Sequence, residues 1–226
     1  MVERKEYLQK LWSWKDEQVI KVVTGIRRCG KSTLLKQYQN KLKSAGVTEE
    51  QIISINFEEL ENEPLLDYKS LYQYIKERLC EDKMTYIFLD EIQKVTSFEK
   101  VVDSLHVKEN IDIYITGSNA KLLSGELATY LAGRYVEFIV YPFSFAEFLE
   151  LYHSVFPEET VQKSFQQYIL YGGMPYLANI RYADEPSRQY LQDLFNSVQL
   201  KDIVKRNKIR DVDLLERIMA YVMANV

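Results

Sequence analysis

The sequence is poor in cysteine and histidine and has no hydrophobic run long enough to cross a membrane. Its 226 residues include two cysteines and two histidines. Two cysteines are too few for a disulfide framework, and the spacing of Cys29, Cys80, His106 and His153 matches no zinc site. No stretch approaches the ~20 consecutive apolar residues of a membrane-spanning helix. We therefore expect a cytoplasmic protein that does not associate with membranes.

The sequence also lacks an excess of positive charge. It has 29 Lys and Arg residues against 33 Asp and Glu residues, which gives a formal net charge of -4. This balance argues against a protein that coats nucleic acid with its whole surface. The densest basic stretch, residues 201–210, has the charge to contact nucleic-acid phosphates. A solvated helix face and loop is the simpler interpretation of that stretch.

The most informative motif is a glycine-containing loop near the start of the chain. Residues 25–32 read GIRRCGKS and fit G-x-x-x-x-G-K-[ST], the pattern of a phosphate-binding loop. Residues 19–24 before it predict a strand and residues 33–38 after it begin a helix, which is the context that the motif requires. The loop N–H groups and the helix N-terminus together attract phosphate. We predict that the nucleotide is bound by Gly25, Arg28, Cys29, Gly30, Lys31, Ser32 and Thr33.

The side chains of this loop have separate predicted roles. Lys31 reaches the β- and γ-phosphates, Ser32 binds Mg²⁺ and Thr33 contacts the α-phosphate. Cys29 has two interpretations. The charges of Arg28 and Lys31 favour its thiolate, which would make the loop sensitive to oxidation. Alternatively, Cys29 is a small side chain that fills space.

A second motif lies at the end of an apolar run. Residues 86–89 read YIFL, which is typical of a strand buried on both faces of a parallel sheet, and Asp90 and Glu91 follow directly. Ligands bind at the C-terminal ends of strands in such sheets. We predict that Asp90 supports the Mg²⁺ ion. Glu91 is then the general base that activates the attacking water.

A third strand, residues 111–116, ends in a short polar segment. Asn119 is our first candidate for a contact with the attacking water or the γ-phosphate, and Ser118 is the second. Both residue types are also good helix N-caps, so capping is an equally good interpretation.

These motifs resemble the AAA-type branch of the P-loop ATPases. They resemble more closely a prokaryotic family, related to archaeal and STAND-type ATPases, whose ATPase domain is followed by a C-terminal domain of unknown function. The matching segments are GIRRCGKSTLL (25–35), FLDEIQ (88–93), ITGSNAKLLS (115–124), LAGRYVEF (131–138), YPFSFAEF (141–148) and YGGMP (171–175). The resemblance implies that ATP and Mg²⁺ are the ligands and that the strand order is 5-1-4-3-2.

Strands alternate with helices in the first part of the chain. This alternation predicts an α/β fold, a P-loop NTPase with a five-stranded, mostly parallel sheet flanked by helices. The expected strands are residues 19–24, 51–57, 86–89, 111–116 and 134–140. The expected helices between them are residues 3–14, a helix from residue 33, residues 65–79 and residues 98–107.

The second part of the chain is helical. Pro142 ends the last strand, and Ser144 caps the helix that follows. We therefore place a P-loop ATPase domain at residues 1–140 and a small all-helical region at residues 141–226. The final helical pattern has no stop signal, and relatives in the family are longer. We expect the helical region to be the start of a truncated C-terminal domain.

Three basic or aromatic residues have open interpretations. Arg134 opens the fifth strand, and in related AAA-type enzymes an arginine often reaches the γ-phosphate of a neighbouring subunit in a homo-oligomer. A surface ion pair is an equally good interpretation of Arg134. Arg4 and Tyr7, which precede the first strand, are candidates for adenine contacts, although core packing is the simpler role.

These observations together predict an Mg²⁺-dependent ATPase that drives or gates the interaction with a partner. Its expected catalytic residues are Lys31, Glu91, Asn119 and Arg134, and Ser32 and Asp90 are the expected metal ligands. The alternative is a slow or non-hydrolysing nucleotide switch whose helical part contacts a protein or DNA partner.

Overall fold

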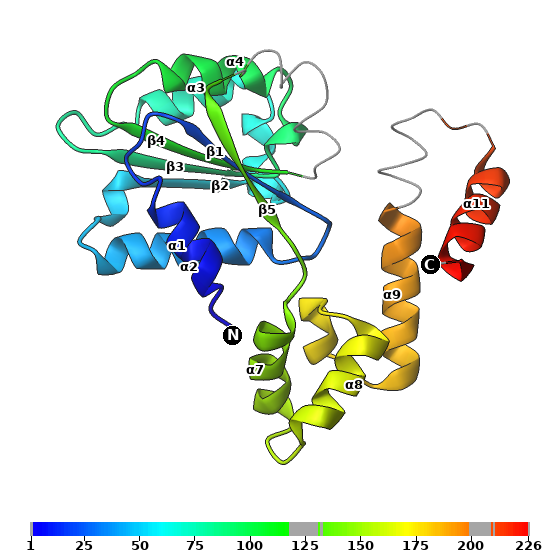
Figure 1. The fold of residues 1–226 in the computed structure, drawn as a ribbon. Helices are drawn as coiled ribbons and strands as arrows, with labels where there is room; N and C mark the ends of the chain where they lie inside the picture. Colours follow the sequence, from blue (N-terminus) through cyan, green and yellow to red (C-terminus); the bar gives the residue numbers. More distant parts are fainter. Residues whose placement is uncertain (1, 118–130, 132, 199–208, 210, 226) are drawn as a thin grey trace. The chain divides into compact units, whose positions relative to one another are not determined.

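The structure is a computed structural model that describes residues 2–117, 131, 133–198, 209 and 211–225. The chain divides into two compact units, Met1–Ala178 and Asn179–Val226, which are described separately. The colours of Figure 1 follow the chain through both units.

The first unit contains one parallel β-sheet. Its strands are β1 (Ile20–Gly25), β2 (Ile52–Asn56), β3 (Thr85–Asp90), β4 (Ile111–Thr116) and β5 (Tyr135–Val140). All four pairs of neighbouring strands are parallel, and the order is β2-β3-β4-β1-β5. This order confirms the predicted sequence of strands 5-1-4-3-2, and the α/β fold class is confirmed with it.

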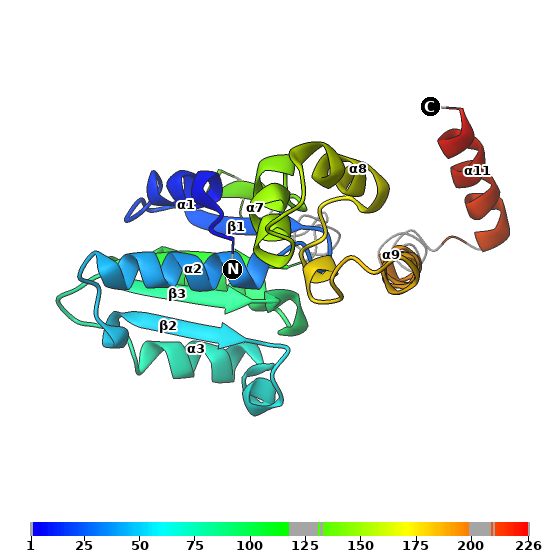
Figure 2. The ribbon, with the colours of Figure 1, turned by 90° about the horizontal axis from the view of Figure 1, so that it is seen from below.

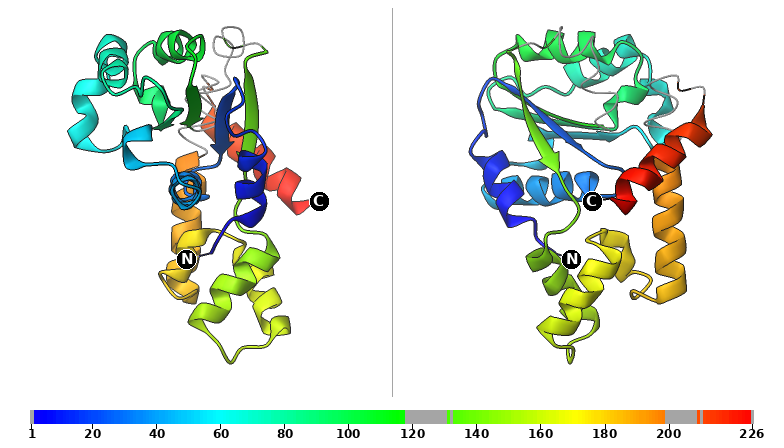
Figure 3. Two further views of the ribbon diagram at one scale, coloured as in Figure 1. Left: turned by 90° about the vertical axis from the view of Figure 1, so that its left-hand side faces the viewer. Right: turned by 45° about the vertical axis from the view of Figure 1, so that its right-hand side comes forward.

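Helices cover both faces of this sheet (Figures 1 and 3). One face packs against α1 (Lys5–Trp12) and α2 (Lys31–Ser44), and the other against α3 (Tyr68–Lys76) and α4 (Phe98–His106). Figure 2 shows α2 and α3 on opposite sides of β2 and β3. Short 3-10 helices are η1 (Glu49–Gln51), η2 (Leu60–Leu65) and η3 (Ile92–Lys94).

The burial of each strand follows its place in the sheet. Every residue of β1 and β3 is buried, whereas the edge strands β2 and β5 alternate between buried and exposed positions. Within β1, Ile20 and Val22 join the core under α3 and α4, and Val23 joins the core under α1 and α2. The continuous apolar run of residues 86–89 therefore marks a central strand, as expected for a sheet covered on both faces.

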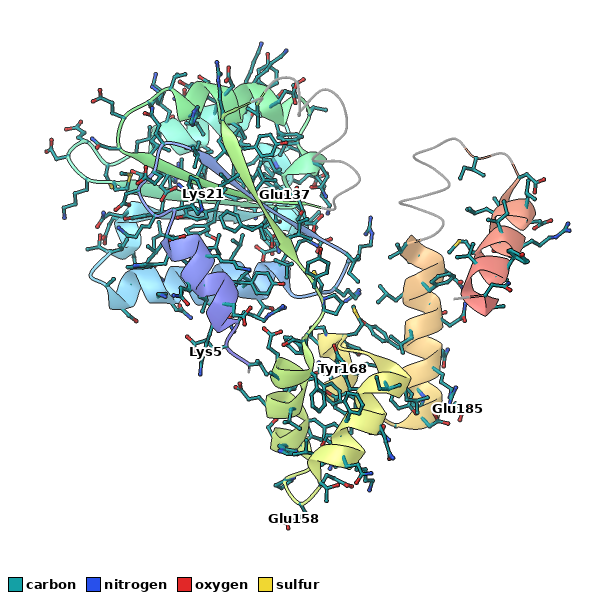
Figure 4. All side chains as sticks on the ribbon, viewed as in Figure 1. Lys5, Lys21, Glu137, Glu158, Tyr168 and Glu185 are labelled. Carbon is teal, nitrogen blue, oxygen red and sulfur yellow. The ribbon has the colours of Figure 1, made fainter. Side chains whose placement is uncertain are left out.

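Two helices after β5 belong to the same unit. They are α7 (Phe145–Val155) and α8 (Val161–Tyr171), followed by the 3-10 helix η4 (Pro175–Ala178). Ser144 caps α7 through a capping box with Glu147, as the sequence predicted. The segments before α7 and after α8 meet, because the Phe143 N–H donates to the Gly173 carbonyl at 2.8 Å. Tyr168, labelled in Figure 4, donates its hydroxyl to the Phe143 carbonyl.

The second unit contains α9 (Asp184–Val198) and α11 (Val212–Ala224). The Asp211 side chain caps α11 by accepting the Leu214 N–H. Most of the basic stretch at residues 201–210 lies outside the described residues. The domain boundary expected between residues 140 and 141 stays a prediction. The two compact units divide at a different place, after Ala178.

Candidate functional site

The predicted site lies where β1, β3 and β4 end at one edge of the sheet. In a parallel sheet the C-terminal strand ends share an edge, and this edge is the usual ligand site of α/β folds. The phosphate loop follows β1, Asp90 ends β3, and Thr116 ends β4. Because β4 lies between β1 and β3, Thr116 lies between the loop and Asp90 in the order of strands.

Two glycines in the loop occupy positions that a side chain would disturb. Gly25 has a φ of +145°, and a Cβ atom there would lie 2.2 Å from the Val140 carbonyl oxygen. Gly30 has a φ of +100° and begins α2 from a left-handed conformation. Both backbone positions are ones that L side chains rarely adopt. The loop shape therefore depends on glycine at both ends of the motif.

The N-terminus of α2 is open toward the loop. Its N-cap is Gly30, which has no side chain to accept the N–H groups of the first turn. Ser32 and Thr33 in that turn are exposed. N–H groups without a side-chain cap and the positive end of the helix dipole favour an anion. These residues therefore fit a phosphate group.

Lys31 supplies a cation at the same place. Its side chain is buried, and its Nζ donates to the carbonyls of Gly25 at 3.2 Å and Ile26 at 3.1 Å. The ammonium group thus folds back over the first turn of the loop. Its two acceptors are neutral carbonyls, so an anionic phosphate oxygen is the stronger partner for this charge.

Cys29 is buried in the core beneath the loop. Its Sγ lies close under Gly25, 3.0 Å from the position that a Cβ atom of that glycine would take. Burial raises the pKa of the Cys29 thiol, although the charges of Lys31 and Arg4 oppose that shift. Lys31 does favour the thiolate, as predicted, but burial outweighs this effect and the net shift of the pKa is upward. The structure agrees with the alternative of a small side chain that fills space.

Asp90 and Glu91 are held by Thr116, a residue that the sequence analysis did not single out. The Thr116 hydroxyl donates to Asp90 Oδ1 and accepts the Glu91 N–H, the latter at 3.0 Å. Glu91 has a φ of +57°, which is uncommon for a residue with a side chain. The hydrogen bond to its N–H supports this conformation. One feature of the sequence could have identified Thr116: it is the last residue of β4, the strand beside β3.

The Glu91 side chain has a partner of its own. Gln93 Nε2 donates to Glu91 Oε2, and Gln93 Oε1 is buried without a hydrogen-bond partner among the described residues. In this arrangement one oxygen of the predicted general base is occupied. The sequence analysis also missed Gln93, although it lies only two residues after Glu91.

The two remaining predicted catalytic residues are Asn119 and Arg134. Asn119, and with it Ser118, lies outside the described residues. Arg134 forms an ion pair with Asp103, and its carbonyl accepts the N–H of Ile20 at 2.9 Å. Because Ile20 begins β1 and the loop follows its end, Arg134 lies at the opposite end of the strand. The ion-pair interpretation describes the observed contact, and a role in a neighbouring subunit stays a prediction.

The described residues contain no ready-made metal site of protein ligands alone. No group of three or more His, Cys, Asp or Glu side chains is close enough together in them to hold a metal ion. Mg²⁺ is often bound by one or two protein oxygens together with phosphates and water. Ser32 and Asp90 offer two such oxygens and fit that mode. Across the same residues, no helix has both the length and the apolar character needed to span a membrane.

Comparison with known proteins identifies the family. Residues 17–149 match the family model of an AAA domain, and residues 162–226 match a domain of unknown function, DUF8612. The chain belongs to this AAA domain family. It therefore combines an AAA-type ATPase domain with a C-terminal domain of unknown function, as the resemblance in the sequence implied.

Individual relatives agree with this assignment. An uncharacterized protein of Haemophilus influenzae is 42% identical over 100% of this chain and 56% of its own length. The uncharacterized protein MJ1544 of Methanocaldococcus jannaschii is 31% identical over 91% of this chain and 47% of its own length. The chain thus spans about half the length of these curated relatives. The Walker-type ATPase Paby2304 of Pyrococcus abyssi shares the fold, with a TM-score of 0.58 and 18% identity over 93% of this chain and 76% of that one.

Proposed function

We propose that this protein binds ATP together with Mg²⁺ and hydrolyses it to ADP and phosphate, and that hydrolysis drives or gates the interaction with a partner. The observation that carries the proposal is the arrangement at one sheet edge. An uncapped helix N-terminus and a buried lysine follow β1, and an Asp-Glu pair ends β3. This combination provides charge stabilisation for phosphate and a candidate base for water.

The loop residues bind and orient the nucleotide in this proposal. The N–H groups of the first turn of α2 and the Lys31 ammonium hold the β- and γ-phosphates. Thr33, exposed in that turn, contacts the α-phosphate, and Arg28 lies at the loop surface. Ser32 and Asp90 are the proposed ligands of Mg²⁺, which neutralises the charge that develops on the transferred phosphoryl group.

Glu91 is the proposed general base. Its carboxylate has to leave Gln93, at least in part, before both of its oxygens are free for water. Asn119 is the proposed contact to the γ-phosphate. Arg134 is the proposed arginine supplied to a neighbouring subunit, since its place at the far end of β1 excludes a role in its own site.

A second candidate function is a slow nucleotide switch. The contact between Gln93 and Glu91 favours it, because a base that stays bonded hydrolyses ATP slowly. The output of such a switch is contact of the helical part with a protein or DNA partner. The cytoplasm remains the predicted location under either candidate.

Steady-state phosphate release, measured with and without DNA, tests these proposals. Lys31→Ala should weaken ATP binding. Glu91→Gln should keep binding and slow hydrolysis by roughly 10²-fold or more, which is the scale of a lost general base. Glu109→Gln, an exposed residue before β4 at the opposite edge of the sheet, is a matched control and should leave both quantities unchanged. Hydrolysis at the wild-type rate in Glu91→Gln would show that this residue is not the base.

Mixing variants tests the role of Arg134. If Arg134 acts in a neighbouring subunit, specific activity rises with protein concentration. A mixture of Arg134→Ala and Lys31→Ala subunits then recovers part of the activity, because each supplies what the other lacks. Activity that is independent of concentration, with no recovery on mixing, leaves Arg134 with its ion pair to Asp103 alone.

A further inference from the structure

A buried arginine joins the phosphate loop to the first helix after the sheet. Arg4 precedes α1 and is 3% exposed. Its Nη1 donates to the Cys29 carbonyl at 3.3 Å, and its Nη2 donates to the Tyr141 carbonyl at 3.0 Å. Its Nε lies 2.7 Å from Glu147 Oε1 in an ion pair. One guanidinium group therefore contacts the loop, the end of β5 and α7.

The contact with Cys29 affects the orientation of a loop amide. A trans peptide is planar, so the C=O of Cys29 and the N–H of Gly30 point in opposite directions. Because Arg4 donates a hydrogen bond to that carbonyl, the Gly30 N–H points away from Arg4. This N–H belongs to the glycine that begins α2, within the predicted phosphate site.

Glu147 connects the same arginine to the cap of α7. Its Oε1 faces Arg4, while its Oε2 accepts the Ser144 N–H at 2.9 Å and the Ser144 hydroxyl at 3.1 Å. The two oxygens have different tasks, so the tasks can be separated by substitution. A glutamine at this position can keep its oxygen on Ser144, but it then presents an NH₂ group to the guanidinium.

Two aromatic rings and the turn after α8 also lie near the Arg4 guanidinium. The Tyr7 and Phe143 rings lie 4.5 Å and 5.1 Å from the Arg4 Cζ atom. A Cβ atom on Gly30 would lie 4.0 Å from both Arg4 Nη1 and Pro175 Cγ, so the turn after α8 also reaches the loop. Arg4 and Glu147 also line a cleft of about 690 Å³.

We infer that Arg4 is a positioning residue that couples nucleotide binding at the phosphate loop to α7 through Glu147. The inference rests on the proposed function, since it requires a nucleotide at the loop. A phosphate that accepts a hydrogen bond from the Gly30 N–H changes the orientation of the peptide between Cys29 and Gly30. The hydrogen bond from Arg4 to the Cys29 carbonyl changes with it, and so does the ion pair between Arg4 and Glu147. Coupling of this kind is reciprocal: a change at Glu147, whose carboxylate contacts Arg4 and Ser144, alters nucleotide affinity at the loop.

ATP affinity measured with a fluorescent ATP analogue tests the coupling. Glu147→Gln should weaken binding by about tenfold, within the usual range of such coupling. Arg4→Met should weaken it by at least as much, and the double variant should bind like Arg4→Met alone, because the effect of Glu147 passes through Arg4. Arg4→Lys keeps the charge but cannot reach three acceptors, so it should not restore affinity.

Two control variants separate coupling from stability. Ser144→Ala removes the cap of α7 and should lower the melting temperature while leaving ATP affinity within about twofold. Glu150→Gln removes an exposed charge from the same helix and should leave affinity unchanged. Affinity of Glu147→Gln within twofold of wild type, or singles whose effects multiply in the double variant, would overturn the coupling. Absence of ATP binding in the wild type would instead overturn the proposed function, and the coupling with it.

Discussion

A buried ion pair at the other end of β1 allows a sharp test of the structure. Lys21 in β1 and Asp112 in β4 are both fully buried, and Lys21 Nζ lies 2.5 Å from Asp112 Oδ1. Asp112 Oδ2 also accepts the Asp16 N–H and the Tyr114 hydroxyl, each at 2.9 Å. Figure 4 labels Lys21 within the sheet. We predict that Lys21→Met destabilises the protein strongly and in a pH-dependent way.

The predicted loss of folding stability follows from the charge of Asp112, which Lys21→Met leaves without its partner. Without Lys21, the Asp112 carboxyl remains buried and is neutralised by a proton. Protonating a carboxyl of ordinary pKa near 3.9 at pH 7 costs about 4 kcal/mol, at about 1.4 kcal/mol for each pH unit. This value agrees with the roughly 3–5 kcal/mol lost when one partner of a buried pair is removed. At pH 5 the same proton costs about 1.5 kcal/mol.

The sign of the pH dependence is set by the protons bound in each state. Burial already raises the pKa of Asp112 in the wild type, and Lys21 opposes that shift. In Lys21→Met the opposition is lost, so above about pH 4 the folded state holds one proton more than the unfolded state. The variant therefore loses stability as pH rises through the window above the unfolded pKa. The difference from wild type should grow by about 2.7 kcal/mol between pH 5 and pH 7, at about 1.4 kcal/mol for each pH unit.

Urea unfolding of both proteins at pH 5, 6 and 7 measures this difference. Lys15→Met is a matched control, because Lys15 also pairs with an aspartate but lies partly exposed near the surface. The control should lose less than about 1 kcal/mol, with little change between the pH values. A loss of less than 1 kcal/mol in Lys21→Met, or a loss that stays constant from pH 5 to pH 7, would refute the reasoning.

Three further predictions concern the site and its surroundings. Thr116→Val should raise the Mg²⁺ concentration needed for half-maximal phosphate release by about 10- to 100-fold, because Asp90 loses its hydrogen-bond partner. Thr116→Ser should restore the wild-type requirement for Mg²⁺, and an unchanged requirement in Thr116→Val would contradict this role. Gly173→Ala should cost about 3 kcal/mol in urea unfolding, since a Cβ atom there would lie 2.1 Å from a backbone oxygen; a cost below 1 kcal/mol would show that this contact relaxes. Iodoacetamide should modify the partly exposed Cys80 at least about tenfold faster than Cys29, because Cys29 is buried and burial raises the pKa of its thiol. Mass spectrometry measures both rates, and equal rates would show that the reagent reaches Cys29 beneath the loop.

Much of the fold could be predicted from the sequence because local signals agree with each other. The two glycines of the loop mark backbone positions with φ values of +145° and +100°, which other residues rarely adopt. The apolar runs mark the strands that are covered on both faces, and the motifs at their ends share one edge because the strands are parallel. The strand order itself came from the family resemblance, since no local pattern specifies which strands are neighbours.

The missed residues act through contacts between distant parts of the chain. Arg4 and Glu147 are 143 positions apart by number, and although Arg4 is a candidate for adenine contacts and Glu147 lies in the segment YPFSFAEF, nothing in the sequence pairs them. Lys21 interrupts an otherwise apolar strand, and only the packing of β4 beside β1 shows that Asp112 neutralises it. The balance of effects at Cys29 has a related cause. Nearby charges are visible in the sequence, but the burial that outweighs them is a property of the folded core.

The positions of these contacts indicate how a bound nucleotide acts on the rest of the protein. At its start, β1 is held by the ion pair of Lys21, and at its end Gly25 lies against the Val140 carbonyl with no room for a Cβ atom. The strand beneath the loop is therefore fixed at both ends. The loop contacts Arg4 through the Cys29 carbonyl, and Arg4 and Glu147 line a cleft. If the proposed nucleotide binds, we therefore expect a change in the loop to act on α7 through Arg4 rather than on the sheet.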